Sequence, residues 1–264
     1  MTTTITARDS APVAVAAASG GALTLVALVW IALGSRTGQA WDESAMNTVT
    51  GGRDTRLAVL SLLGYVSIGA VVAVVAGCVV VALLRGRLAL AAAAIAVVAG
   101  ANVTTQVLKH TILERPDFGN GTLNSLPSGH TTVVASAVGA ALLVAPALSR
   151  PVIALAGGFA TTLTGASTIV AGWHRPSDVV AALAVSLVWT AGVALLLNGR
   201  AQRVGGTLAG AVVGCAGALL FLVAIGVRPV TGWDGFVDSA LVLGAVTAAT
   251  AVFVVAASVS SPAE

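Results

Sequence analysis

The sequence predicts an all-α fold, a polytopic bundle of helices that crosses a membrane several times. Two observations of composition lead to this fold class: 57% of the 264 residues are hydrophobic, and only 9% are charged. Because charged residues make up about a quarter of an average soluble domain, so apolar a chain belongs to the membrane class. The third observation is that apolar runs of about 20 residues, long enough to cross the hydrocarbon core as a helix, recur along the whole chain.

Eight such runs predict eight membrane-spanning helices within one membrane domain, residues 1–264. They cover residues 12–34, 58–84, 88–108, 131–148, 152–173, 179–197, 205–226 and 237–258. The first run follows Arg8 as a secretory signal would. Its apolar region is too long for a signal peptide, so we expect a spanning helix there as well.

Small residues inside the predicted spans are explained by packing. Cys78 and Cys215 fall within apolar runs, where cysteine behaves as a small hydrophobic residue rather than as half of a disulfide or a metal ligand. The glycine-rich stretch at 204–210 is typical of membrane helices that approach each other closely. We therefore expect these residues to pack helices and not to bind a ligand.

The charges in the connections predict the orientation in the cell membrane. If the N-terminus is cytoplasmic, the connections on that face contain basic residues and no acid, which are Arg85, Arg87, Arg150, Arg200 and Arg203. Short basic loops favour the cytoplasm. The opposite connections mix basic residues with nearly all the acids, so we expect them on the extracytoplasmic face.

The connection 35–57 is a long polar segment with two open interpretations. Its Trp41 and Met46 are suited to the membrane interface. A plain connecting loop fits equally well.

The remaining polar chemistry is concentrated in two connections, 109–130 and 174–178, which emerge on the same face. They contain the only lysine and all three histidines of the chain. Ionisable groups at the ends of membrane helices usually serve a function. The candidate set is Lys109, Arg115, Ser128, His130, His174, Arg175 and Asp178. Such cations, imidazoles and hydroxyls, next to turn-forming Pro and Gly, are suited to binding an anion.

Phosphoryl transfer would explain this set of residue types. It requires fixed cations, backbone donors, a nucleophile and an acid for the leaving oxygen. Lys109 and Arg115 can supply the cations. Pro127 is suited to the first helical position of the next span, which would aim the N–H groups of Ser128, Gly129 and His130 at the anion.

The sequence HRPSD predicts an activated histidine. Pro176 is suited to open the sixth span, which places Asp178 in the first helical turn and within reach of His174. A carboxylate that accepts the Nδ1 hydrogen leaves Nε2 as a nucleophile. His130, at the rim of the other connection, could give a proton to the leaving oxygen.

These motifs resemble the type 2 phosphatidic acid phosphatases, membrane lipid phosphatases related to the vanadium haloperoxidases. That family has a lysine followed by Arg-Pro, then Pro-Ser-Gly-His, then Ser-Arg followed by histidine and, four residues later, aspartate. The corresponding segments are KHTILERP (109–116), PSGH (127–130) and STIVAGWHRPSD (167–178). The resemblance covers about residues 55–200, a six-helix core, and leaves two C-terminal spans at about 205–258 outside it.

The resemblance implies a role for each matching residue. His174 would attack phosphorus and form a phosphohistidine, Asp178 would orient it, and His130 would protonate the leaving group. The phosphate oxygens would be held by Lys109, Arg115, Ser128 and Gly129. No metal or other cofactor is then required, because fixed cations replace it. The implied substrate is a lipid phosphate in the membrane, such as a polyprenyl phosphate or diphosphate, phosphatidic acid or phosphatidylglycerol phosphate, and no nucleic acid is expected as a partner.

Two departures from the family pattern affect the cations. Only five residues separate Lys109 from Arg115, one fewer than the commonest family spacing, and Thr168 stands where the family has arginine. Arg175 could replace that arginine from another direction. We expect Glu114 and Asp117 to be solvated charges that partner Arg115. A lipid-phosphate binder or transporter without hydrolysis, and a phosphotransferase on the same fold, stay open as alternatives.

Overall fold

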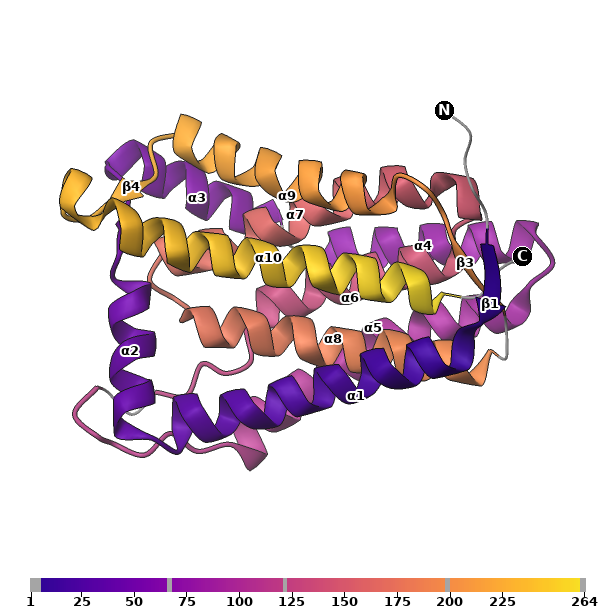
Figure 1. Ribbon diagram of the computed structural model, residues 1–264, viewed down its shortest axis with the longest axis horizontal. Helices are drawn as coiled ribbons and strands as arrows, with labels where there is room; N and C mark the ends of the chain where they lie inside the picture. The colour runs from indigo at the N-terminus through magenta and orange to yellow at the C-terminus, as the bar shows by residue number, and fades with distance from the viewer. Residues whose placement is uncertain (1–5, 66–67, 121–122, 198–199, 262–264) are drawn as a thin grey trace.

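The computed structural model is a bundle of long helices and describes residues 6–65, 68–120, 123–197 and 200–261 (Figure 1). Its α-helices are α1 (Ser10–Leu28), α2 (Arg36–Met46), α3 (Arg53–Tyr65), α4 (Ile68–Leu84), α5 (Leu88–Val107), α6 (Gly129–Val144), α7 (Arg150–Val170), α8 (Pro176–Leu196), α9 (Thr207–Ala224) and α10 (Phe236–Ser260). Two π-helical turns, η1 (Val29–Leu33) and η2 (Leu108–Ile112), extend α1 and α5, and two 3₁₀ turns, η3 (Ala147–Ser149) and η4 (Gly232–Gly235), precede α7 and α10. The predicted all-α bundle is confirmed.

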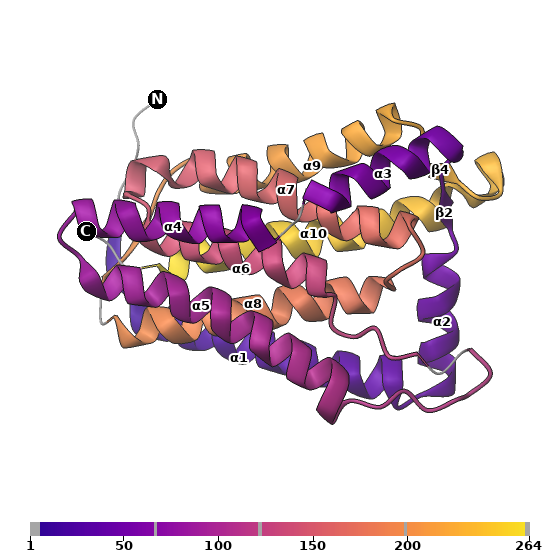
Figure 2. The ribbon, with the colours of Figure 1, turned by 180° about the vertical axis from the view of Figure 1, so that it is seen from behind.

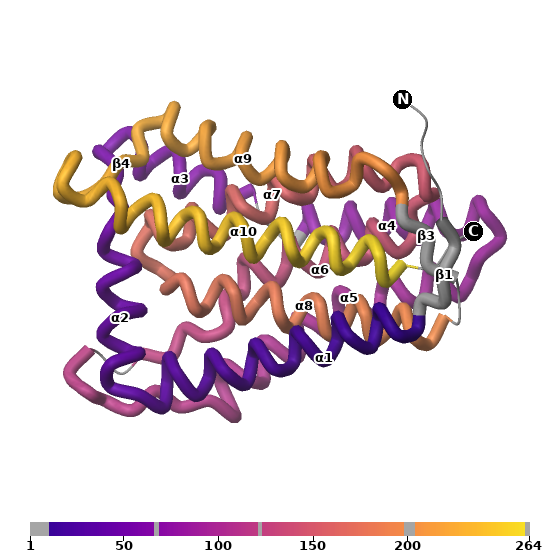
Figure 3. Tube along the Cα trace, viewed as in Figure 1, coloured from indigo at the N-terminus to yellow at the C-terminus, as the bar shows by residue number. Residues whose placement is uncertain are grey.

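Four short strands join chain segments at the two ends of the bundle. β1 (Thr6–Asp9) pairs antiparallel with β3 (Arg200–Arg203). This ladder lies at the end of the bundle where α1 begins and α10 ends, and the tube in Figure 3 shows α2 at the other end. β2 (Val49–Thr50) pairs with β4 (Arg228–Pro229) at the opposite end. These ladders tie the N-terminal segment to the C-terminal helices.

Fewer helices than predicted have the length of a membrane span. Among the described residues, six helices are long and apolar enough: Ala11–Leu33, Leu88–Ile112, Ala147–Val170, Pro176–Leu196, Thr207–Ala224 and Gly232–Ser260. The predicted span 58–84 is divided into α3 and α4, which are bent by 43° relative to each other and could form a seventh, broken span. The predicted span 131–148 is the 16-residue α6, which ends before Pro146 because the residue preceding a proline is driven out of the helical region.

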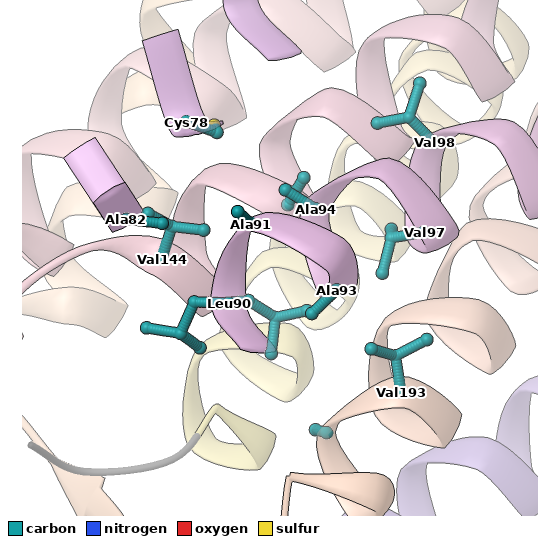
Figure 4. Close-up of a cluster of buried hydrophobic side chains, with 13 residues drawn as sticks. Cys78, Ala82, Leu90, Ala91, Ala93, Ala94, Val97, Val98, Val144 and Val193 are labelled. Atoms are coloured by element: carbon teal, nitrogen blue, oxygen red, sulfur yellow. The ribbon is translucent and has the colours of Figure 1, made fainter. Parts of the chain in front are cut away.

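The core is rich in alanine and valine, whose small side chains let the helices lie close together. One cluster includes Cys78, Ala82, Leu90 and Ala94, and joins α4 to α5 (Figure 4). Both cysteines of the chain are buried and free, as predicted. At Gly210 on α9, an added Cβ would collide with the backbone of α7, which confirms that this glycine serves helix packing.

The connection predicted as an interfacial segment or a loop contains a helix, α2, that lies across one end of the bundle (Figures 1 and 2). Ser35 caps it by accepting a hydrogen bond from the Gly38 N–H at 3.0 Å. Buried Gln39 donates from Nε2 to the carbonyl oxygens of Leu33 (3.2 Å) and Pro116 (3.1 Å). These bonds fix α2 between the end of α1 and the connection that follows α5.

Candidate active site

The two polar connections meet at the end of the bundle that α2 covers. Asn124 Nδ2 donates to the carbonyl oxygens of Lys109 (3.3 Å) and Leu113 (2.9 Å), which folds the longer connection back on the end of α5. The Ser128 N–H donates to the Asp178 carbonyl oxygen at 2.9 Å, which joins the start of α6 to the first turn of α8. Residues far apart in sequence therefore form one site.

His174 and Asp178 form the contact that the HRPSD segment predicts. Helix α8 begins at Pro176, with Arg175 at the N-cap and Asp178 in the first turn. His174 Nδ1 lies 3.3 Å from Asp178 Oδ2. Both side chains are buried, with 7% and 0% of their surface exposed. With Nδ1 occupied by the carboxylate, Nε2 is the ring nitrogen available for chemistry.

Two further donors converge on the same carboxylate oxygen. Ser125 Oγ donates to Asp178 Oδ2 at 2.6 Å, and the Arg175 N–H donates to it at 2.8 Å. Asp178 is therefore held from three directions. Sequence reasoning missed Ser125, because no spacing rule brings a serine of the longer connection to the start of α8.

The PSGH segment is arranged differently from the prediction. Pro127 precedes the helix, and Ser128 is the N-cap of α6, whose hydroxyl accepts hydrogen bonds from Thr131 N (3.4 Å) and Thr131 Oγ1 (3.0 Å). The prediction that Pro127 occupies the first helical position is wrong, because α6 begins at Gly129. The prediction that the Ser128 N–H is free for an anion is also wrong, because this N–H donates to the Asp178 carbonyl oxygen. The N–H groups of Gly129 and His130 lie in the first turn of α6, where intrahelical acceptors are lacking.

His130 lies beside the other candidate groups. Its ring is 5.6 Å from the ring of Trp173, measured between centroids. It also lies close enough to His174 and Lys109 to interact electrostatically with both. Lys109 is partly buried in η2, where it lies close enough to Asp178 for an electrostatic attraction between the two side chains. Both predicted histidines and the predicted lysine therefore surround one small region.

Arg115 is the most unusual group of the site. It is 5% exposed, and its Nε, Nη1 and Nη2 atoms have no hydrogen-bond partner among the described residues. Burial lowers the pKa of the Arg115 guanidinium, the charge of Arg175 acts in the same direction, and the charges of Asp42, Asp178 and Glu43 oppose both. The geometry is that of a desolvated cation with all its donors open.

The acids predicted to partner Arg115 lie elsewhere. Glu114 is exposed, and the Asp117 carboxylate accepts a hydrogen bond from the Gly119 N–H at 2.8 Å. Both acids are exposed, as predicted for solvated charges. The predicted pairing with Arg115 is wrong, because the buried guanidinium has no hydrogen-bond partner among the described residues.

Arg175 is held in place by acceptors on both sides. Its Nε donates to Glu43 Oε2 at 2.6 Å, and its Nη1 donates to Ser125 Oγ at 3.0 Å. Thr168, at the family's arginine position, is buried and donates to the Gly165 carbonyl oxygen at 2.7 Å. Its own carbonyl oxygen accepts from the His174 N–H at 3.3 Å, so Thr168 supports the turn that carries the histidine.

Helix α2 contributes two acids that sequence reasoning missed. The Asp42 carboxylate accepts from the Ser177 N–H (3.0 Å) and the Ser177 hydroxyl. Burial raises the pKa of Asp42, against the lowering effect of these hydrogen bonds. The signal was present, since Gln39, Asp42, Glu43 and Met46 follow the i, i+3, i+4, i+7 spacing of one helix face.

The structure is a helical bundle of the membrane class, in which a buried histidine–aspartate pair lies near a guanidinium that has no hydrogen-bond partner among the described residues. Residues 87–202 match the family described as the PAP2 superfamily, so this segment of the chain is similar to that superfamily. The superfamily is generally one of phosphatases and other phosphoesterases, and the resemblance seen in the motifs is confirmed. No curated protein and no solved structure matches the chain.

Proposed function

We propose that the protein is an integral membrane lipid phosphatase that hydrolyses a phosphomonoester or diphosphate through a phosphohistidine on His174. One observation supports it above all, the buried Arg115 guanidinium with three open nitrogens beside the His174–Asp178 pair. A buried cation without hydrogen bonds is costly, and a bound anion relieves that cost. The planar fork of arginine fits two phosphate oxygens at once.

The reaction has two steps. In the first, the lone pair of His174 Nε2 attacks phosphorus, the bond from phosphorus to the leaving oxygen breaks, and His130 gives that oxygen its proton. In the second, His130 takes a proton from water, the water oxygen bonds to phosphorus, and the P–N bond breaks with its electron pair returning to His174. Asp178 keeps the nucleophile in its reactive tautomer throughout.

The remaining groups stabilise the phosphoryl oxygens. Lys109 and Arg115 supply positive charge, the N–H groups of Gly129 and His130 point out of the N-terminus of α6, and Arg175 lies next to the nucleophile. Ser128 acts through its place at the N-cap of α6. Since these fixed charges can meet the needs of the reaction, we infer turnover without a metal.

The lipid character of the substrate is supported by an apolar cavity below the site. It lies between α4, α6 and α7 and is lined by Val133, Val134 and Ala137, which begin one turn after His130 on α6. A lipid whose phosphate meets His174 could lay its hydrocarbon chain along this surface. We favour a polyprenyl phosphate or diphosphate at the extracytoplasmic face, where recycled carrier lipids arise, ahead of phosphatidic acid and phosphatidylglycerol phosphate.

Phosphate release by the purified protein in detergent tests the proposal. The substrates are a polyprenyl diphosphate, a polyprenyl monophosphate, phosphatidic acid and phosphatidylglycerol phosphate, each with and without EDTA, and His174→Ala is the matched variant. We expect release from at least one lipid, unchanged by EDTA and lost in the variant. Binding of these lipids without any release would favour a binder or transporter, and a loss in EDTA that magnesium restores would contradict the metal-free reaction.

A further inference from the structure

We propose that Asp42 and Glu43 of α2 are positioning residues of the phosphate site, which hold Arg175 and the start of α8 in place and balance the buried charge of Arg115. This inference rests on the proposed function, because it assumes that these cations meet a phosphate. Helix α2 lies outside the segment 87–202 that matches the PAP2 superfamily, so the two carboxylates come from a part of the chain with no assigned role.

Glu43 is the outer end of a chain of contacts that leads to the nucleophile. Its carboxylate accepts from Arg175 Nε, and Arg175 Nη1 donates to Ser125 Oγ. Ser125 in turn donates to Asp178 Oδ2, the oxygen that holds His174. The side chains of Arg175 and Glu43 are 11% and 29% exposed, so the ion pair is partly shielded from water and less weakened by salt than a fully exposed pair. A shift of Glu43 would therefore reach Arg175 first and Asp178 next.

Asp42 fixes the same region from the neighbouring turn. It accepts hydrogen bonds from both the N–H and the hydroxyl of Ser177, at the start of α8. A carboxylate at a helix N-terminus is favoured by the helix dipole. Because Asp178 belongs to the same first turn, Asp42 sets the position of the carboxylate that orients His174.

The two acids also explain how Arg115 can be buried with open donors. The charges of Asp42, Glu43 and Asp178 act on it, yet none of the three accepts a hydrogen bond from its guanidinium. Charge balance from a distance reduces the cost of desolvation. Acids in direct contact would instead occupy the nitrogens that a phosphate needs. The arrangement therefore keeps the cation in place and its donors free.

A double-mutant cycle on binding of inorganic phosphate tests the inference. Calorimetric titration of the purified protein would compare wild type with Glu43→Gln, Arg175→Gln and the double variant. We expect each single variant to weaken phosphate binding by about tenfold, and the double variant to be no weaker than Arg175→Gln alone, since contacting residues are not additive. Glu43→Asp should restore part of the affinity. Glu114→Gln, an exposed acid of the neighbouring connection, is the matched control and should bind as wild type does.

Other results would overturn the inference. Wild-type affinity in Glu43→Gln, or equal and additive losses in the cycle, would show that Glu43 does not act through Arg175. Tighter binding in Glu43→Gln would show that Glu43 competes with phosphate for Arg175 instead of positioning it. If lipids are not hydrolysed but the cycle shows coupling, the proposed reaction fails and the positioning role stands. Absence of phosphate binding by the wild type would contradict both.

Discussion

The two sides of the site differ in how far their hydrogen bonds are satisfied. On the His174 side, Asp178 Oδ2 receives Ser125, the Arg175 N–H and the histidine ring. On the Arg115 side, three buried nitrogens have no partner among the described residues. If His174 is the nucleophile that we propose, the difference teaches that its ring is oriented without a substrate, whereas the proposed phosphate-binding cation, Arg115, keeps its donors open for the substrate. Preorganised groups of both kinds lower the cost of reaching a charged transition state.

The largest expected effect falls on the oriented side. His174→Gln removes the nucleophile and keeps a polar side chain of similar size, so we expect turnover to fall by about a thousandfold or more. Binding of inorganic phosphate should change little, since the cations remain. Steady-state phosphate release and calorimetry measure the two quantities. Substantial turnover in the variant would show that His174 is not the nucleophile, and the two sides of the site would then not differ in the way that we propose.

On the open side, Arg115→Gln should lower kcat/KM by about 100-fold, the effect of losing one strong transition-state donor. Arg115→Lys should recover only part of that loss, because lysine keeps the charge and lacks the planar fork. The matched control is Arg87→Gln, before α5 and at the opposite end of that helix, which should be neutral. Equal activity of Arg115→Lys and wild type would mean that charge alone matters and that the open fork has no special use.

A smaller effect is expected for Ser125, the serine that joins Asp178 to Arg175 on the His174 side. Ser125→Ala removes the donor to Asp178 and the acceptor for Arg175, so we expect kcat to fall by about tenfold with KM less affected, as for supporting residues of other sites. Ser125→Thr keeps the hydroxyl and should restore most of the rate. Kinetics of the three proteins measure this. A pure KM effect would place Ser125 with the phosphate-binding groups rather than with the nucleophile.

The smallest expected effect concerns pH and stability. Burial raises the pKa of Asp42, so the folded protein keeps this proton at a pH where the unfolded chain has lost it. The free energy of unfolding from this group therefore falls as pH rises from the ordinary aspartate range through the raised pKa. Asp42→Asn should lack this component, which Tm measured against pH for both proteins would reveal. Identical pH profiles would show that Asp42 titrates as it does in the unfolded chain.

Local rules predicted the parts of the molecule that depend on neighbours in sequence. The apolar runs gave the bundle, and the four-residue spacing from His174 to Asp178 gave their contact, because Pro176 starts a helix between them. The span count was too high, since Pro146 ends α6 early and α3 bends away from α4. Long-range contacts were not predictable in this way. Glu43 is 132 residues from Arg175, and only the folded chain brings them together.

The central claim is that His174 carries the phosphoryl group. The most direct measurement is rapid acid-free quenching of the protein with the lipid that it hydrolyses fastest, followed by mass spectrometry of the peptide that contains His174. The proposed reaction predicts a phosphate on His174 that forms with lipid, is lost in acid and is absent from His174→Ala. Turnover without any phosphorylated His174, or a phosphate on another residue, would contradict it.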